Sequence, residues 1–334
     1  MGVMKLDFLA IGDTVIDNFI RLKDARVNCD MNDENCLLCV RFGDKVPFEF
    51  SVEVPAVGNA ANAAVAASRL GLSTALRTYL GRDDHGARCL AALEKDRVDT
   101  SLIARQDGKL TNYHYVLWYE SERTILIKHE QYDYEAPVLR EPPAWVYLSS
   151  LGENSLPYHA ELAKLFASWP ETKIAFQPGT YQMKFGAAAL RDIYARADLF
   201  FCNKEEAQKI TGIETDDVKR LMDALRAKGP KNIVLTDGRK GAYALEEGGS
   251  RWFVPMYPDP RPPYERTGAG DAFASSVTAA LALGLPLREA LLWGPVNAME
   301  VVQAIGAQKG LVTREQMEKF LKEAPADYRL SPLP

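Results

Sequence analysis

The stretch Glu265-Arg-Thr-Gly-Ala-Gly-Asp-Ala-Phe273 is the most informative part of this chain. It leads from a run of small residues into an alanine-rich segment typical of a helix. Small residues let backbone N–H groups converge, and the first N–H groups of a helix are unpaired and lie at the positive end of its dipole. The stretch therefore predicts an anion-binding helix start, built from the backbone of Gly268, Ala269 and Gly270.

Asp271 follows these three residues and falls in the first turn of the expected helix. A carboxylate beside an anion site can accept the proton of an attacking hydroxyl while the backbone amides stabilise a transferring γ-phosphoryl group. The plainer interpretation is a tight turn followed by a helix-capping aspartate. The pattern favours phosphoryl transfer with Asp271 as the base.

Upstream of this stretch, short apolar strands alternate with helical segments. Such alternation predicts βαβ units and a doubly wound, mostly parallel α/β sheet flanked by helices. The chain after the stretch reads as helical. We expect strands at 145–149, 173–176, 199–202 and 232–236, and helices at 157–168, 184–196, 204–211, 215–228, 272–283, 287–304 and 314–323.

The first third of the chain contains a buried strand at 6–11 and an alanine-rich helix at 59–70. Two other segments alternate apolar and polar residues, as half-exposed antiparallel strands do. We expect these segments to pair into a small β lid. The expected domains are an α/β body of 1–18, 55–111 and 131–334, and a lid of 19–54 and 112–130.

Composition narrows the function further. The 334 residues carry a net charge of −5, which argues against nucleic acid as the main partner, and no stretch predicts a membrane span or a signal peptide. The expected location is the cytoplasm. Cys29, Cys36 and Cys39 cluster, but no histidine or second Cys pair lies nearby, so we expect three reduced thiols rather than a metal site.

Five motifs, in order along the chain, resemble those of the ribokinase-like carbohydrate kinases, the PfkB family. Thr267-Gly-Ala-Gly-Asp271 is similar to the C-terminal signature of that family, and Gly58-Asn-Ala-Ala-Asn62 is similar to its N-terminal signature. The other three are Gly81-Arg-Asp-Asp-His-Gly86, Asn203-Lys-Glu-Glu206 and Thr236-Asp-Gly238-Arg-Lys-Gly241. The resemblance spans nearly the whole chain and implies a ribokinase-like fold with a kinase activity.

The resemblance also implies a role for individual residues. The family places a carboxylate on substrate hydroxyls, and Asp17, on the loop expected after the first strand, matches it; Asp13 is expected to buttress that loop. Mg²⁺ is expected to be held through water, and a monovalent cation is a further expected ion. The implied substrate contacts are Asp17, Gly58, Asn59, Asn62 and Glu153; the nucleotide contacts are Asn203, Thr236, Gly238, Gly241, Thr267 and Asn297; the magnesium contacts are Asn203 and Glu206.

Some positions depart from the family pattern. Val57 stands where a second glycine is usual, Glu265-Arg266 replaces an Asp-Thr pair, and Gln177-Pro-Gly179 replaces a polar Asp/Asn pattern. None of these departures removes the base or the anion site, so the catalytic expectation stands while the substrate stays open.

The sequence therefore predicts an ATP-dependent kinase that phosphorylates a hydroxyl of a sugar or sugar derivative. A nucleoside kinase of the same superfamily is the alternative, because aromatic residues of the expected lid could stack on a base, although they could equally pack the lid itself. A sugar-binding regulator without catalysis is a more distant alternative. The expected lid strands present free edges, which makes a homodimer through the lid plausible.

Overall fold

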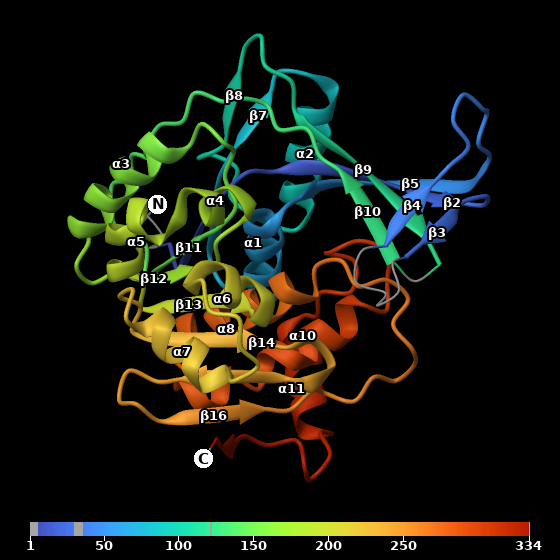
Figure 1. The fold of residues 1–334 in the computed structure, drawn as a ribbon. Helices are drawn as coiled ribbons and strands as arrows, with labels where there is room; N and C mark the ends of the chain where they lie inside the picture. Colours follow the sequence, from blue (N-terminus) through green and yellow to red (C-terminus); the bar gives the residue numbers. More distant parts are fainter. Residues whose placement is uncertain (1–5, 30–35, 121, 334) are drawn as a thin grey trace.

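The computed structural model describes residues 6–29, 36–120 and 122–333, and Figure 1 shows a large twisted sheet covered by helices, with a smaller sheet projecting to one side. Six neighbouring strands of the large sheet are parallel, and three antiparallel strands extend one edge. In spatial order the strands are β6 (Thr74–Arg77), β1 (Phe8–Ile11), β11 (Trp145–Leu148), β12 (Lys173–Phe176), β13 (Leu199–Asn203), β14 (Asn232–Thr236), β15 (Ala242–Leu245), β16 (Arg251–Val254) and β17 (Ser331–Pro332).

Alternate residues of the central strands feed two separate hydrophobic cores, one on each face of the sheet. On β1, Phe8 and Ala10 join one core while Leu9 and Ile11 join the other. The first core is covered by α1 (Asn59–Arg69), α2 (Asp84–Lys95), α8 (Ala269–Ala282), α9 (Leu287–Ala290), α10 (Trp293–Val301) and α11 (Arg314–Lys322). The second is covered by α3 (Leu156–Ala167), α4 (Thr180–Ala189), α5 (Arg191–Arg196), α6 (Lys204–Thr211) and α7 (Val218–Arg226).

The predicted doubly wound, mostly parallel α/β sheet is therefore confirmed. Connections through helices on both faces bring the carboxyl ends of the parallel strands to one edge of the sheet, where such folds place their sites. No helix in the part of the chain that the structure describes is long and apolar enough to span a membrane.

The smaller sheet has the strand order β10-β9-β2-β5 and is called the small sheet below. Its inward face buries Phe19, Val116 and Trp118, while Phe48 and Leu126 are exposed. The strands are β2 (Val15–Leu22), β5 (Phe48–Val57), β9 (Asn112–Tyr119) and β10 (Glu122–Leu126); short ribbons are formed by β3 (Arg26–Asn28) with β4 (Leu37–Cys39) and by β7 (Tyr79–Gly81) with β8 (Ala104–Gln106).

Asp17 was expected on a loop, and this expectation is wrong. It lies within β2, paired with Val54 of β5 on one side and with His114 of β9 on the other. The carboxyl group is therefore held by a sheet rather than by a loop, because β2 begins only four residues after β1 ends.

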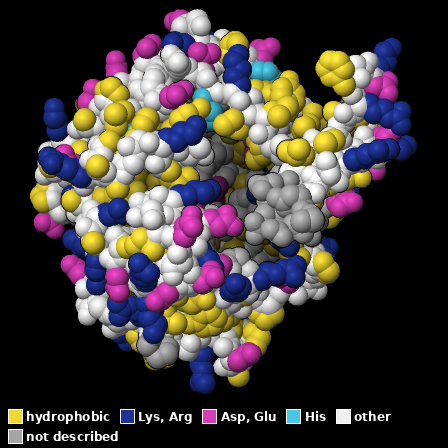
Figure 2. All heavy atoms as spheres, viewed as in Figure 1, with side chains coloured by type: hydrophobic (Ala, Val, Ile, Leu, Met, Phe, Trp, Pro, Cys, Tyr) yellow, Lys and Arg dark blue, Asp and Glu magenta, His cyan; other side chains and the backbone are white. Residues whose placement is uncertain are grey.

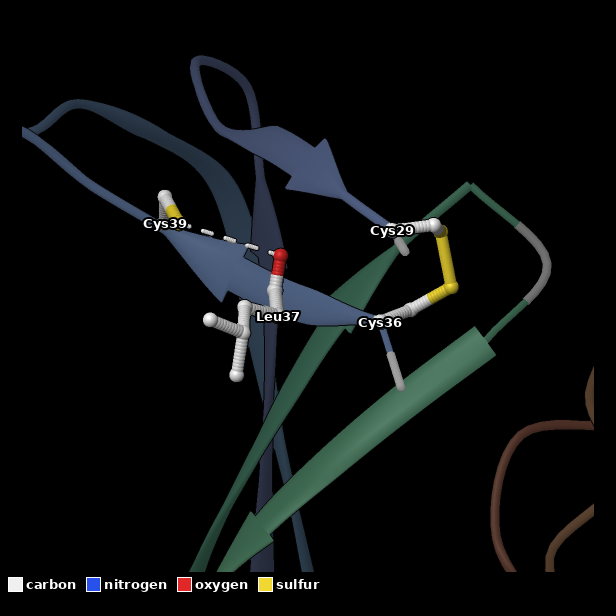
Figure 3. The surroundings of a disulfide bond; sticks show 4 residues. All are labelled: Cys29, Cys36, Leu37 and Cys39. Atoms are coloured by element: carbon white, nitrogen blue, oxygen red, sulfur yellow. Dashed lines mark hydrogen bonds between the residues drawn. A yellow bond between two sulfur atoms is a disulfide. The ribbon is translucent and has the colours of Figure 1, made fainter. Parts of the chain in front are cut away.

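The expectation of three reduced thiols is also wrong, because Cys29 and Cys36 form a disulfide (Figure 3). The β3–β4 ribbon pairs Asn28 with Leu37, so the two cysteines, each one residue further out, face each other across it. Cys39 pairs with Arg26 at the other end of the ribbon and is a free, exposed thiol. The antiparallel register, which the spacing of the cysteines does not reveal, decides the pairing.

Candidate active site

Two adjoining cavities open at the N-terminal end of α8. The outer cavity, of about 430 Å³, has apolar walls that include Met256, Tyr257 and Met299. The inner cavity, of about 220 Å³, contains Asp271 and Gln177. The face drawn in Figure 2 is hollowed near its centre, where acidic and basic side chains gather. Both cavities are lined by Asn203, Thr236, Arg266, Ala269, Gly270 and Phe273, so they are continuous with each other.

α8 begins at Ala269, three residues before the helix expected from the sequence. Gly268 precedes the helix in a left-handed conformation, with φ of 82°, and an added Cβ would lie 2.4 Å from the Cβ of Ala307. Only glycine fits such a position without strain. Gly270 has open space where its Cβ would be. The free N–H groups of the first helical turn therefore face a cavity that a small anion could enter.

Asp271 is held at this cavity by two amide side chains from distant elements. Asn62 donates to its Oδ2 at 2.8 Å, and Gln177 donates to its Oδ1 at 3.2 Å. Burial raises the pKa of Asp271, while hydrogen bonds from Asn62, Gln177 and Asn59 act in the opposite direction. A desolvated carboxyl with a raised pKa is a stronger base than a solvated one.

The amide groups are themselves fixed. Gln308 donates to Oδ1 of Asn62 at 3.0 Å, which leaves the amide of Asn62 directed at Asp271. Tyr147 donates to Oε1 of Gln177, which likewise directs its amide at the carboxyl. Gln177 was noted in the sequence only as a departure from the family pattern, but the structure makes it a direct partner of Asp271.

At the N-terminus of α1, Gly58 has a φ of 115°, and an added Cβ would lie 2.6 Å from the carbonyl oxygen of Asp13. Glycine is thus required where the two chain segments meet. Asn59, the first residue of the helix, lines the inner cavity. Gly58, Asn59 and Asn62 are therefore grouped around one helix start next to Asp271.

Asn203 and Glu206 form a reciprocal cap at the start of α6. Oδ1 of Asn203 accepts from the N–H of Glu206 at 2.8 Å, and Oε2 of Glu206 accepts from the N–H of Asn203 at 2.9 Å. Both residues also line the inner cavity, and burial raises the pKa of Glu206. Among the described residues no group of three or more His, Cys, Asp or Glu side chains could enclose a metal ion.

The remaining predicted nucleotide contacts are divided. Thr236, Gly238 and Gly241 line the outer cavity. Thr267 instead donates its backbone N–H, at 2.7 Å, and its hydroxyl to Oε1 of Glu265, which is 3% exposed. Thr267 therefore shapes the loop before Gly268 by holding a buried carboxylate.

Arg123, from β10 of the small sheet, also approaches that carboxylate. Its Nε lies 3.6 Å from Oε1 of Glu265, and its side chain lines the inner cavity. Nearby, Arg266 lies 3.8 Å from Glu122 of the same strand. These two ion pairs connect the small sheet to the start of α8.

Two predicted contacts do not reach the cavities. Asn297 is fully buried, donates to Ser276 at 2.7 Å and accepts from the N–H of Val312 at 3.0 Å. It joins α10 to its neighbours because its side chain faces the core, away from the outer cavity. Glu153 is exposed in a turn and lines neither cavity.

The sequence did not predict a group of polar residues beside Asp17. Nδ1 of His114 lies 3.4 Å from Oδ1 of Asp17, and Nδ1 of His129 lies 3.9 Å from Oδ2 of Asp13. The two imidazole rings are 5.2 Å apart. The chain has only four histidines, and two of them, His114 and His129, lie in or beside segments that read as strands. This was the one signal in the sequence that pointed to the group.

Comparison with known proteins agrees with this geometry. The pfkB family carbohydrate kinase model matches residues 24–314. The chain is 29% identical to a cytidine kinase of Thermococcus kodakarensis over 269 residues, covering 75% of this chain and 87% of the relative. It is 26% identical to a ribokinase of Haemophilus influenzae over 275 residues, covering 80% and 87%. The solved ribokinase of Arabidopsis thaliana, complexed with ribose and ATP, superposes with a TM-score of 0.79 at 18% identity, over 96% of this chain and 99% of that one, which shows a common fold.

Proposed function

The chain belongs to the pfkB family of carbohydrate kinases, and from this premise we propose that it transfers the γ-phosphoryl group of Mg-ATP to a hydroxyl of a sugar or sugar derivative. The observation that carries the proposal is the position of Asp271. Its carboxyl lies next to the free N–H groups of α8, in the same cavity as Gly268 and Gly270. Base and anion site therefore meet at the point where a phosphoryl group and a hydroxyl would react.

The outer cavity suits a nucleotide. Its apolar side, with Met256, Tyr257 and Met299, can contact a flat base, and Gly238 and Gly241 allow close backbone approach to phosphates. Ligands of open α/β sheets bind at the carboxyl ends of the strands, and Thr236 ends β14 at this place. The terminal phosphate would then extend toward Gly270.

Asp271 would take the proton of the attacking hydroxyl while the α8 N–H groups stabilise the transferred phosphoryl oxygens. Gln177 and Asn62 keep the carboxyl in place throughout, because each donates to a different oxygen of it. When bound, Mg²⁺ neutralises phosphate charge. Asn203 and Glu206 are the residues that would hold it, through water.

The acceptor would lie between Asp271 and the small sheet, near Asp17, Gly58, Asn59 and Asn62. Closure of the small sheet over it would exclude water. The ion pair of Arg123 with Glu265 would connect such closure to the anion site, because Arg123 lies on the small sheet and Glu265 lies just before α8.

A nucleoside acceptor is kept as a second candidate because of the similarity to a cytidine kinase. The aromatic residues of the small sheet add little to it. Phe48 and Tyr115 are exposed, and Trp118 packs edge-on against Phe50 at 6.0 Å.

We also propose a homodimer formed through the small sheet, in the cytoplasm. Its surface carries exposed large apolar side chains that would be covered in a dimer: Phe48, Phe50, Tyr115, Ile125 and Leu126. Light scattering on the purified protein tests this, and a monomer at micromolar concentration would contradict it.

The proposed function is tested by incubating the purified protein with Mg-ATP and a panel of pentoses, hexoses, keto-sugar acids and nucleosides, and following ADP release. Asp271→Asn serves as the control for contaminating kinases. We expect turnover on one class of acceptor that is lost in the variant. ATP binding without turnover on any acceptor would contradict the proposal, and absence of ATP binding would favour a non-catalytic regulator.

A further inference from the structure

Arg266 is a basic residue that lies where the two cavities join. It lines both the outer and the inner cavity, whereas Arg239 lines only the outer cavity and Arg123 lines only the inner one. A nucleotide in the outer cavity would extend its terminal phosphates past this junction toward Asp271. Arg266 is therefore positioned to contact the phosphate chain of the donor at the point where the phosphoryl group is transferred.

Two other basic groups at these cavities are neutralised by nearby carboxylates. In the inner cavity, Arg123 lies 3.6 Å from the buried side chain of Glu265. In the outer cavity, Lys204 lies 2.5 Å from Asp216 and 3.8 Å from Asp237. A cation that is held close to an opposite charge attracts a further anion only weakly, because the two fields largely cancel.

The partner of Arg266 is weaker than these. Its guanidinium lies 3.8 Å from Oε1 of Glu122 on β10, and the two side chains are 48% and 71% exposed. Ion pairs between exposed side chains contribute little to stability, because water screens the charges and both side chains lose freedom. The guanidinium can therefore exchange Glu122 for a phosphate with little loss of stability. Its planar group also suits two-point contact with phosphate oxygens.

The turn that carries Arg266 is fixed next to the anion site. Thr267, the following residue, donates its backbone N–H to the buried carboxylate of Glu265 at 2.7 Å, so the residues on both sides of Arg266 are held to each other. Gly268 then leads directly into α8. Arg266 replaces the threonine of the Asp-Thr pair noted in the sequence. The cation is therefore an addition of this chain to the turn that forms the anion site.

We propose that Arg266 binds the terminal phosphates of the donor nucleotide and adds a positive charge to the backbone anion site during phosphoryl transfer. The inference rests on the proposed kinase function. The negative charge of the transferred group is spread over its equatorial oxygens. The N–H groups of α8 offer hydrogen bonds to these oxygens, and Arg266 supplies the full charge that the N–H groups lack. Glu122 is the partner of the guanidinium when no nucleotide is bound.

Nucleotide binding tests the inference without an acceptor. Isothermal titration calorimetry in the presence of Mg²⁺ gives the affinities of the wild type and of Arg266→Gln for ATP and for AMP, which lacks the terminal phosphates. Loss of a charge-assisted contact should weaken the binding of ATP about tenfold or more and leave that of AMP unchanged. An equal loss for both nucleotides, or no loss for either, overturns the inference and leaves the kinase function intact. A wild type that binds neither nucleotide overturns both.

A coupled ADP assay, with the acceptor that the panel identifies, measures the effect on transfer. Arg266→Gln should lower kcat about 10²-fold, as expected for one lost contact to the transferred group. Arg266→Lys keeps the charge but not the planar fork, so it should recover part of this loss. A full kcat in Arg266→Gln overturns the role in transfer. If the wild type turns over no acceptor, that role fails with the proposed function, and the binding of ATP and AMP still tests the phosphate contact.

Two further variants separate the phosphate contact from the ion pair. Glu122→Gln removes the partner of Arg266 and should bind ATP at least as tightly as the wild type. A loss as large as that of Arg266→Gln would show that the ion pair itself is needed, and it would overturn the inference. Arg314→Gln is the matched control, because Arg314 is 47% exposed, pairs with Glu318 at 2.8 Å and lines neither cavity. Its affinities for both nucleotides should equal those of the wild type.

Discussion

Replacing Gly268 by alanine should lower the stability of the protein, whereas replacing Gly270 by alanine should lower its turnover. At Gly268 the backbone is left-handed, with φ of 82°, and the new methyl group would lie 2.4 Å from Cβ and 2.7 Å from Cα of Ala307. The left-handed conformation costs about 1–2 kcal/mol in a residue with a side chain, and overpacking costs about 1–3 kcal/mol. Gly268→Ala should therefore lower the free energy of unfolding by about 2–5 kcal/mol.

At Gly270 the backbone is helical and the methyl group would meet no protein atom within 4 Å. The helix should even gain up to about 1 kcal/mol. The methyl group would, however, project into the cavities where we place the phosphoryl group, beside Asp271. Loss of one such stabilising contact costs about 10²-fold in kcat.

Urea denaturation followed by circular dichroism gives the stabilities, and the coupled ADP assay gives kcat. Gly268→Ala should lower the denaturation midpoint, whereas Gly270→Ala should leave it unchanged or raise it slightly. A Gly268→Ala protein as stable as the wild type would refute the strain argument. A Gly270→Ala protein with full turnover would refute the location of the anion site.

Three further predictions test other parts of the structure. Burial raises the pKa of Asp13 from the ordinary 3.8 to about 7, so the stability that its protonated carboxyl contributes is lost as the pH rises toward 7. Asparagine does not titrate, so the free energy of unfolding of Asp13→Asn should rise by about 3 kcal/mol relative to that of the wild type between pH 5 and pH 8. A difference between the two proteins that stays constant over this range would contradict the shift. Asn297→Ala should lower stability by about 1–3 kcal/mol through its two lost internal hydrogen bonds and leave the KM for ATP unchanged, whereas a raised KM with normal stability would return Asn297 to the nucleotide. Alkylation and mass spectrometry of the denatured, unreduced protein should label three of the five cysteines and all five after reduction, and five labels without reduction would contradict the Cys29–Cys36 disulfide.

The buried parallel strands were predictable because each is a short apolar run. The bounds expected at 173–176 and 232–236 are those of β12 and β14. The antiparallel strands β15, β16 and β17 were not predicted, since they are short and carry exposed or half-buried residues among the buried ones. β15 pairs with β14, β16 with β15 and β17 with β16, so each becomes a strand through a partner that lies apart from it in the pattern.

Helix breaks also escaped prediction. The segment 184–196 was expected as one helix, but Gly186 has a φ of 81° and a second helix, α5, begins at Arg191. The segment 287–304 is likewise divided into α9 and α10. Apolar periodicity continues across both breaks, so the pattern alone does not reveal where the backbone changes direction.

For the candidate site, local motifs predicted which residues gather at the starts of α1, α6 and α8. They did not predict the contacts between elements. Asn62 and Gln177 reach Asp271 across 209 and 94 residues of sequence, and the His114–Asp17 pair depends on the register of β2 with β9. Asn297 was expected at the nucleotide but faces the core, because its position in the sequence gives no information on which way its helix faces.

The most direct test of the account is a single-turnover experiment in which excess enzyme, Mg-ATP labelled at the γ-phosphate and the preferred acceptor are mixed and quenched rapidly. The label should pass to the acceptor in the wild type. In Asp271→Asn the rate of this transfer should fall about 10²–10⁴-fold, while the acceptor binds with nearly unchanged affinity. Transfer at close to the wild-type rate in Asp271→Asn would contradict the assignment of Asp271 as the base.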